Sequence, residues 1–162
     1  MRNLLFVVLG SALLAQGSAN AQTPNGAINH YRDGTRKIGK GDLEGAIEEY
    51  SRAIAISSRL NSSDSESDET SNITVVDPFT ANAYTNRGVA RYRKGDFEGA
   101  KADFDAALRI RPGLANAYLN RAATRRELGD LQGALVDLDK AISIQPKLFE
   151  AYNNRGSIRH EI

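Results

Sequence analysis

Residues 83–88 read AYTNRG, and nearly the same six residues return 34 positions later at 117–122 (AYLNRA) and again at 151–156 (AYNNRG). A second stretch keeps the same spacing, because GDFEGA at 95–100 returns as GDLQGA at 129–134. A fixed period of this length is typical of chains in which one supersecondary unit is stacked several times. The period therefore predicts a repeat architecture, which provides binding surfaces rather than reaction centres.

An earlier copy of the unit lies upstream, where residues 41–46 read GDLEGA. Its offset from residues 95–100 is 54, which is one period plus an insertion of 20 residues. The sequence thus divides into three full repeats, a half repeat and one insert. The full repeats are 27–60, 81–114 and 115–148, the half repeat is 149–162, and the insert is 61–80.

Each unit has the pattern of two helices joined by a tight turn. In the second copy we expect helices at about 81–94 and 97–110, since Gly95 can end a helix in the left-handed conformation and Asp96 can cap the next one. Proline ends the second helix at Pro112 and, in the next copy, at Pro146. Small residues recur where the two helices must cross closely, namely Gly88, Ala100 and Ala107, then Ala122, Ala134 and Ala141. A pair this short cannot bury its apolar face alone, so the repeats must stack.

This spacing of small, aromatic and proline positions resembles the tetratricopeptide repeat, over residues 27–60 and 81–162. The resemblance implies an all-α, right-handed α-solenoid of about seven helices. There are departures, because the chain has no Trp and a Tyr takes the usual aromatic place, at Tyr84, Tyr118 and Tyr152. The first copy departs furthest, with His30 at the aromatic place and Ser58 at the proline place.

Residues 1–21 have the features of a secretory signal peptide. They combine an early positive charge, an apolar stretch at 4–15 that is too short to span a bilayer, and small residues at Ala19 and Ala21. We expect cleavage after Ala21, which leaves 22–162 as one repeat domain that is periplasmic or secreted. An uncleaved membrane anchor is the alternative. The chain has no cysteine, which excludes disulfides.

The insert at 61–80 contains five acidic residues and no Lys or Arg, so the repeats carry an excess of about five positive charges. Its polar, acidic composition favours a solvated loop. Two sharper interpretations remain open. One is a calcium site, which would lack the turn glycine and the closing glutamate of an EF-hand loop. The other is a pseudo-ligand that folds back onto the basic repeats.

Three arginine pairs, each spaced by four residues, fall at equivalent places: Arg87 and Arg91, Arg121 and Arg125, Arg155 and Arg159. Helical spacing puts each pair on one face, which suggests a cationic ladder for an acidic partner. The alternative is pairing within the chain. Asp103 and Asp137 follow Arg87 and Arg121 by sixteen residues, so we expect those two arginines to be paired. Arg91, Arg125 and Arg126 are then the freer cations.

The resemblance implies that the first helix of each unit lines a concave face. It places Asn86, Asn120 and Asn154 on that face as a ladder of amides that can bond the backbone of an extended peptide. The alternative is a packing or capping role for these amides. The other residues placed there are Thr85, Val89, Tyr92, Arg93, Leu119, Ala123, Arg126 and Glu127, and of these we select Val89, Tyr92, Leu119 and Arg126 as peptide-binding candidates.

Some chaperone-binding members of the family clamp a terminal carboxylate with Lys, Asn, Asn, Lys and Arg. The corresponding places here hold Tyr31, Thr35, Asn86, Asn116 and Asn120, so only the central Asn matches and we do not expect that specificity.

Catalysis, metal binding, cofactor binding and nucleic-acid binding have little support. His30 and His160 lie at opposite ends of the repeats, and none of the usual hydrolase or phosphate-loop motifs occurs. We therefore expect an exported adaptor or scaffold that binds an extended peptide or a partner protein, an acidic one being one option. Two alternatives remain, an accessory subunit of an envelope enzyme such as a cell-wall hydrolase, and a fragment of a longer repeat protein.

Overall fold

The computed structural model describes residues 24–63 and 78–161, and this part of the chain is entirely helical apart from short turns. The expected signal peptide and residues 64–77 of the insert lie outside the described residues. The described part contains seven helices, as the repeat pattern predicts. They are α2 (Pro24–Gly39), α3 (Leu43–Ser63), α4 (Pro78–Arg93), α5 (Phe97–Ile110), α6 (Ala115–Glu127), α7 (Leu131–Ile144) and α8 (Phe149–Glu161).

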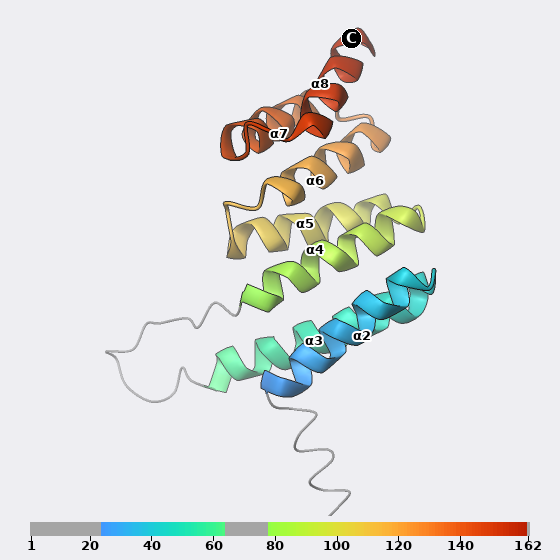
Figure 1. The fold of residues 1–162 in the computed structure, drawn as a ribbon, viewed down its shortest axis with the longest axis vertical. Coiled ribbons are helices and arrows are strands. Elements are labelled where there is room, and N and C mark those ends of the chain that lie inside the picture. Colours follow the sequence, from blue (N-terminus) through green and yellow to red (C-terminus); the bar gives the residue numbers. More distant parts are fainter. Residues whose placement is uncertain (1–23, 64–77, 162) are drawn as a thin grey trace, which may run out of the picture.

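The helices stack in chain order as a solenoid, with α2 and α3 at one end and α8 at the other (Figure 1). Within the repeats, α2 packs against α3, α4 against α5 and α6 against α7. First helices of successive repeats also contact one another, as α2 with α4, α4 with α6 and α6 with α8. No such contact joins the second helices α3, α5 and α7. The first helices therefore lie closer together and form the inner, concave layer.

The turn between the two helices of a repeat is the same in all three copies. Its glycine is in the left-handed region, with φ of 78° at Gly41, 84° at Gly95 and 81° at Gly129. The aspartate that follows caps the second helix. In every copy its Oδ1 accepts a hydrogen bond, at 2.9 Å, from the backbone N–H of the glycine three residues later. The predicted turn, with a glycine that ends the first helix and an aspartate that caps the second, is confirmed.

The two helices of a repeat cross where the first carries a small residue. A Cβ added to Gly34 would lie 2.8 Å from the ring of Tyr50, and one added to Gly88 would lie 2.8 Å from the ring of Phe104. Both rings are fully buried. The third repeat has Ala122 at this place, and the buried partner there is the smaller Leu138. Size is therefore balanced across each crossing, as close packing requires.

The insert begins later and ends earlier than the repeat pattern indicates. Helix α3 continues to Ser63, three residues beyond the expected repeat boundary, because Ser58 stands where proline ends the second helix in later copies. Helix α4 begins at Pro78, three residues before the expected start. Proline is favoured at the first helical position because its missing N–H has no partner there. Among the described helices, none is both long enough and apolar enough to cross a membrane.

Candidate binding groove

Two adjoining pockets open on the concave layer, each with a volume of about 220 Å³. Tyr92 and Ala123 line both, so the pockets form one groove along α4, α6 and α8. Around these two residues, the first pocket is lined by Val89, Arg93, Phe104 and Asn120, and the second by Arg126, Glu127, Leu138, Asn154 and Ile158.

Five of the seven selected peptide-binding candidates line this groove, namely Val89, Tyr92, Asn120, Arg126 and Asn154. Asn86 and Leu119 do not. The Asn86 Nδ2 donates a hydrogen bond to the Tyr31 hydroxyl at 3.1 Å, which ties α4 to α2. Leu119 packs against the apolar core formed by α6, α7 and α8. The amide ladder therefore has two members in the groove and one in a contact between repeats.

Sequence reasoning did not identify the residues contributed by the floor of the groove. Phe104 and Leu138 come from the second helices, and Ile158 comes from α8. Phe104 and Leu138 fill the space between the two helices of their repeats. Both are fully buried and lie against small residues of the first helix, Gly88 and Ala122, beneath the groove.

Tyr92 is held in place at the junction of the two pockets. Its ring packs edge-on against Phe97, with ring centroids 5.4 Å apart, and its hydroxyl donates to Glu127 Oε1 at 3.4 Å. Burial raises the pKa of Tyr92, and the Glu127 carboxylate raises it further. The phenol therefore stays neutral, and its oxygen can still accept a hydrogen bond from a ligand.

Three contacts along the concave layer follow one rule of spacing. Tyr92 meets Glu127 and Arg126 meets Glu161, each pair 35 residues apart, while Tyr31 meets Asn86 at 55 residues. Each separation is one residue more than the offset between the two repeats, which is 34 or, across the insert, 54. Neighbouring first helices are thus in register with a shift of one residue, and this shift decides which side chains meet on the groove wall.

Arg126 is not a free cation. Its guanidinium forms an ion pair with Glu161 of α8, in which Nε donates to Oε2 at 3.2 Å and Nη2 donates to Oε1. Both side chains are substantially exposed, so the pair is of the kind that contributes about 0–1 kcal/mol. A competing carboxylate could therefore displace Glu161 at little cost.

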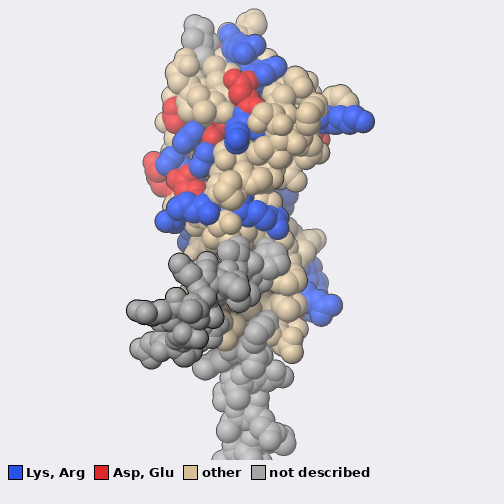
Figure 2. Space-filling model, turned by 90° about the vertical axis from the view of Figure 1, so that its left-hand side faces the viewer, with Lys and Arg blue, Asp and Glu red and all other residues tan. Residues whose placement is uncertain are grey.

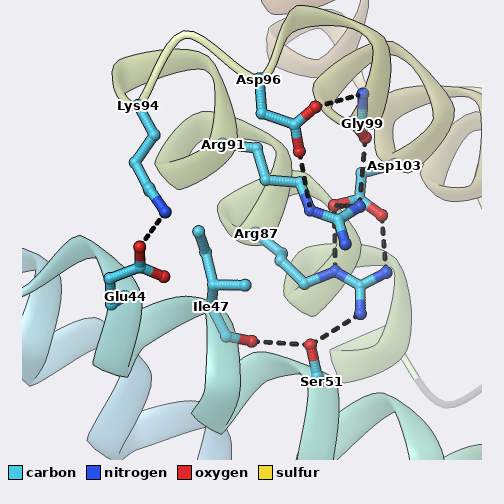
Figure 3. Close-up of polar contacts among 9 residues, drawn as sticks. All are labelled: Glu44, Ile47, Ser51, Arg87, Arg91, Lys94, Asp96, Gly99 and Asp103. Carbon is cyan, nitrogen blue, oxygen red and sulfur yellow. Dashed lines mark hydrogen bonds and ion pairs between the residues drawn. The ribbon is translucent and has the colours of Figure 1, made fainter.

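The expectation that Arg91 and Arg125 are freer cations is wrong. Arg87 holds Asp103 with two bonds, Nη2 to Oδ1 at 2.6 Å and Nε to Oδ2 at 3.0 Å, and the same carboxylate accepts from Arg91 Nη1 at 3.0 Å (Figure 3). Arg91 Nη1 also donates to the Gly99 carbonyl. The acid lies sixteen residues after one arginine and twelve after the other, so both reach it from successive turns of α4.

The third repeat has the same network around Asp137. Arg121 donates to Asp137 through Nη2 at 2.6 Å and Nε at 2.9 Å. Arg125 Nη1 lies 3.0 Å from Oδ2 of the same aspartate. The remaining nitrogen of Arg121, Nη1, donates to Asp105 of the preceding repeat at 2.7 Å. Burial acts to lower the pKa of Arg121, but the bonds to Asp137 and Asp105 outweigh it and the pKa lies above its ordinary value. The predicted pairing of Arg87 and Arg121 is confirmed. These arginines join helices and repeats and do not form a ladder for a ligand.

In the first repeat, His30 and Lys37 contact the acid in place of two arginines. Glu49 stands at the place of Asp103, and its carboxylate meets His30 Nδ1 at 2.7 Å and accepts from Lys37 Nζ at 3.1 Å. Burial acts to raise the pKa of Glu49, but the contacts with His30 and Lys37 outweigh it, and the pKa lies below its ordinary value. A buried acid held by basic side chains of the first helix is therefore common to all three repeats.

One face of the molecule carries charges of both signs. On the side of the solenoid shown in Figure 2, Lys and Arg side chains lie next to Asp and Glu side chains over the upper part of the molecule. Among the described residues, no group of three His, Asp or Glu side chains could hold a metal ion. The groove lining is likewise mixed, with apolar residues beside Asn120, Asn154, Arg126 and Glu127.

Comparison with known proteins agrees with this architecture. Two family models match, "Tetratricopeptide repeat" over residues 81–114 and "TPR repeat" over residues 123–162. No curated protein sequence matches the chain.

Solved structures show the same fold at low sequence identity. The first TPR of Spaghetti (RPAP3) bound to an HSP90 peptide is 24% identical, covers 83% of this chain and 91% of its own, and has a TM-score of 0.69. The Arabidopsis OM64 TPR domain is 21% identical, and the match covers 84% of this chain and 96% of that domain with a TM-score of 0.69. MamA is 20% identical, and the match covers 93% of this chain and 76% of MamA with a TM-score of 0.70. The chain therefore contains tetratricopeptide repeats, arranged as a helical-repeat solenoid.

Proposed function

We propose that this protein is an interaction adaptor that holds an extended peptide segment of a partner protein in the groove along α4, α6 and α8. The observation that carries the proposal is the groove itself, which is continuous across three first helices and combines an aromatic anchor, Tyr92, with two amides, Asn120 and Asn154. Asparagine amides both donate and accept, so they can bond a peptide backbone in either direction. Tetratricopeptide folds are typically interaction scaffolds, and we assign no catalytic role.

Two structural neighbours support peptide binding by this fold. One is the Spaghetti domain with the HSP90 peptide SRMEEVD, and another is the second TPR domain of human RPAP3 with the HSP70 peptide SGPTIEEVD. We infer a different sequence preference here. The central amide of the family's carboxylate clamp is Asn86, which is engaged with Tyr31, and the other clamp places lack Lys and Arg. The expected ligand is therefore an internal, extended segment rather than a free C-terminal EEVD.

We further infer that the protein acts outside the cytoplasm. The sequence of residues 1–21 supports this, with its short apolar stretch and small residues before Gln22. The partner would then be an exported protein. An accessory role beside an envelope enzyme fits the same groove, with one dedicated partner instead of several.

The test is a selection of peptides from a display library on purified residues 22–162, followed by calorimetric titration of the selected peptide. Asn154→Ala should weaken binding by roughly tenfold, the loss typical of removing one buried hydrogen bond. Asn153→Ala is the matched control, because Asn153 is the exposed neighbour on α8 and does not line the groove. Equal losses in the two variants, or tight binding of an EEVD peptide, would contradict the proposal.

A further inference from the structure

The two pockets of the groove differ in charge. Arg93 is the only charged side chain among the described residues that line the first pocket, between α4 and α6. The second pocket is lined by one cation and one acid, Arg126 and Glu127, whose charges offset each other. The first pocket therefore has a positive charge that nothing in its own lining balances.

Arg93 also has no counter-charge in its own part of the chain. Asp96 is the only acidic residue within four positions of it. The carboxylate of Asp96 accepts the capping bond from the Gly99 N–H and pairs with Arg91 Nε at 3.6 Å (Figure 3). Arg93 is exposed and forms no hydrogen bond or ion pair with any residue that the structure describes. Its guanidinium is therefore available to a ligand.

The register between neighbouring first helices explains why Arg93 is unpaired. Neighbours meet at one residue more than the offset between their repeats, which places Ile38 and Leu128 opposite Arg93, 55 residues before it and 35 after it. Neither of these side chains can accept a hydrogen bond. The acids at the equivalent place of the next two repeats, Glu127 and Glu161, are each bound by a residue of the preceding first helix. At this level of the concave layer, Arg93 alone faces two apolar neighbours.

Apolar surface and an amide lie in the same pocket as this cation. Val89 and Ala123 line it from α4 and α6, and the buried ring of Phe104 lies beneath them. A side chain that enters the pocket would bury apolar surface against all three, which favours binding. Asn120 adds an amide that can bond a peptide backbone. The pocket thus fits an apolar side chain and a carboxylate that lie close together on one extended segment.

We propose that the first pocket selects an internal Asp or Glu of the bound segment, whose carboxylate pairs with Arg93 while a nearby apolar residue packs over Val89 and Ala123. This inference rests on the proposed function, because it names the class of peptide that the same groove takes. A guanidinium can hold a carboxylate with two parallel bonds, as Arg87 holds Asp103. The carboxylate comes from a side chain, since the places that would clamp a terminal carboxylate lack Lys and Arg.

A charge reversal in the protein tests this selection. One display library, in which the C-terminus of every peptide is fused to its carrier, is selected on the parent protein and on Arg93→Glu, and the selected peptides are sequenced. The parent should enrich Asp and Glu over Lys and Arg, and Arg93→Glu should reverse that preference. Arg109→Glu is the matched control, because Arg109 is an exposed arginine of α5 that does not line the groove, and it should select as the parent does. An arginine that only stabilised the end of α4 would change thermal stability and leave the selected sequences unchanged.

A double-mutant cycle then assigns the contact. The peptide selected on the parent is synthesised with an amidated C-terminus and titrated into the parent and into Arg93→Gln, which should bind it roughly fivefold more weakly, the upper limit for an exposed ion pair. Changing the acid of the peptide to its amide should weaken binding to the parent by a similar factor and cause little further loss in Arg93→Gln.

The outcomes separate this inference from the proposed function. Peptides that bind the parent but show no preference for acids, or a preference that Arg93→Glu leaves unchanged, would overturn the role of Arg93 and leave peptide binding by the groove intact. Independent losses from the two halves of the cycle would overturn it as well. A library that yields no binding peptide on the parent would overturn the proposed function, and this inference with it.

Discussion

Arg87 and Asp103 form a two-point contact, with Nη2 to Oδ1 at 2.6 Å and Nε to Oδ2 at 3.0 Å, and the aspartate is only 2% exposed. The third nitrogen, Nη1, donates to Ser51 Oγ of the preceding repeat at 2.9 Å. One guanidinium therefore connects both helices of its own repeat to the repeat before it. Because each of the three guanidinium nitrogens has a defined acceptor, the contact fixes geometry as well as charge.

The first prediction concerns the stability contributed by this buried acid. Asp103→Asn should destabilise the protein by about 3–5 kcal/mol, because it leaves the largely buried Arg87 without its counter-charge and Arg91 with only the exposed Asp96. Asp139→Asn is the control, since Asp139 pairs with Arg155 at the surface, and it should cost less than about 1 kcal/mol. Urea denaturation of the two variants measures both values. Similar losses would mean that the buried network has no special role.

The second prediction compares two equivalent glycines. Gly88→Leu should destabilise the protein by at least about 1–3 kcal/mol, because a Cβ there already lies 2.8 Å from the Phe104 ring. Gly156→Leu should be neutral or stabilising by up to about 1 kcal/mol, since the position is open and Leu is a better helix former than Gly. Thermal melts of the two variants decide the matter. A large loss at Gly156 would show that something already covers α8.

These comparisons show what the sequence could and could not predict. The turns were predictable because they depend on adjacent residues, a glycine in the left-handed region and an aspartate that caps the next helix. The crossings at Gly88 and Ala122 were predictable because the same small residues recur with the period. The pairing of Arg87 with Asp103 was also within reach, since both belong to one repeat.

The contacts between repeats were harder to predict. Arg126 meets Glu161 and Tyr92 meets Glu127 only because stacking shifts one first helix by a single residue against the next. That shift is a property of the packed layer and has no local signal. The same holds for Asn86, which the pattern placed on the groove and the structure joins to Tyr31. Arg91 and Arg125 were expected to be unpaired because each repeat offered one aspartate for two arginines. In the structure a single aspartate pairs with both.

The third prediction is a pH dependence from Glu49. Its pKa lies below the ordinary value of 4.5, so the ionised form stabilises the fold fully above about pH 4.5, and this contribution is lost as pH falls through the lower pKa of the folded state. We expect the stability difference between the parent protein and Glu49→Gln to shrink between about pH 6 and about pH 3. Urea denaturation at several pH values measures it.

Lys37→Met provides the control for this pH dependence. It removes one of the two partners that lower the pKa of Glu49, the other being His30, and should make the slope of stability against pH shallower. A difference between parent and Glu49→Gln that stays constant with pH would show that the carboxylate does not titrate differently in the folded and unfolded states.

The last prediction concerns the exposed pair of Arg126 and Glu161 at the groove. Glu161→Gln should free the guanidinium and raise affinity for an acidic peptide up to about fivefold, which corresponds to the roughly 1 kcal/mol that such a surface pair contributes at most. The gain should be larger at low salt, where exposed charges are least screened. Adding Arg126→Ala to this variant should remove the gain in affinity. Glu150→Gln is the second control, because it removes another exposed acid of α8 that does not line the groove, and it should leave affinity unchanged. Fluorescence anisotropy at two salt concentrations is the measurement. If all variants bind alike, the ligand makes its contacts through Tyr92, Asn120 and Asn154 without help from Arg126.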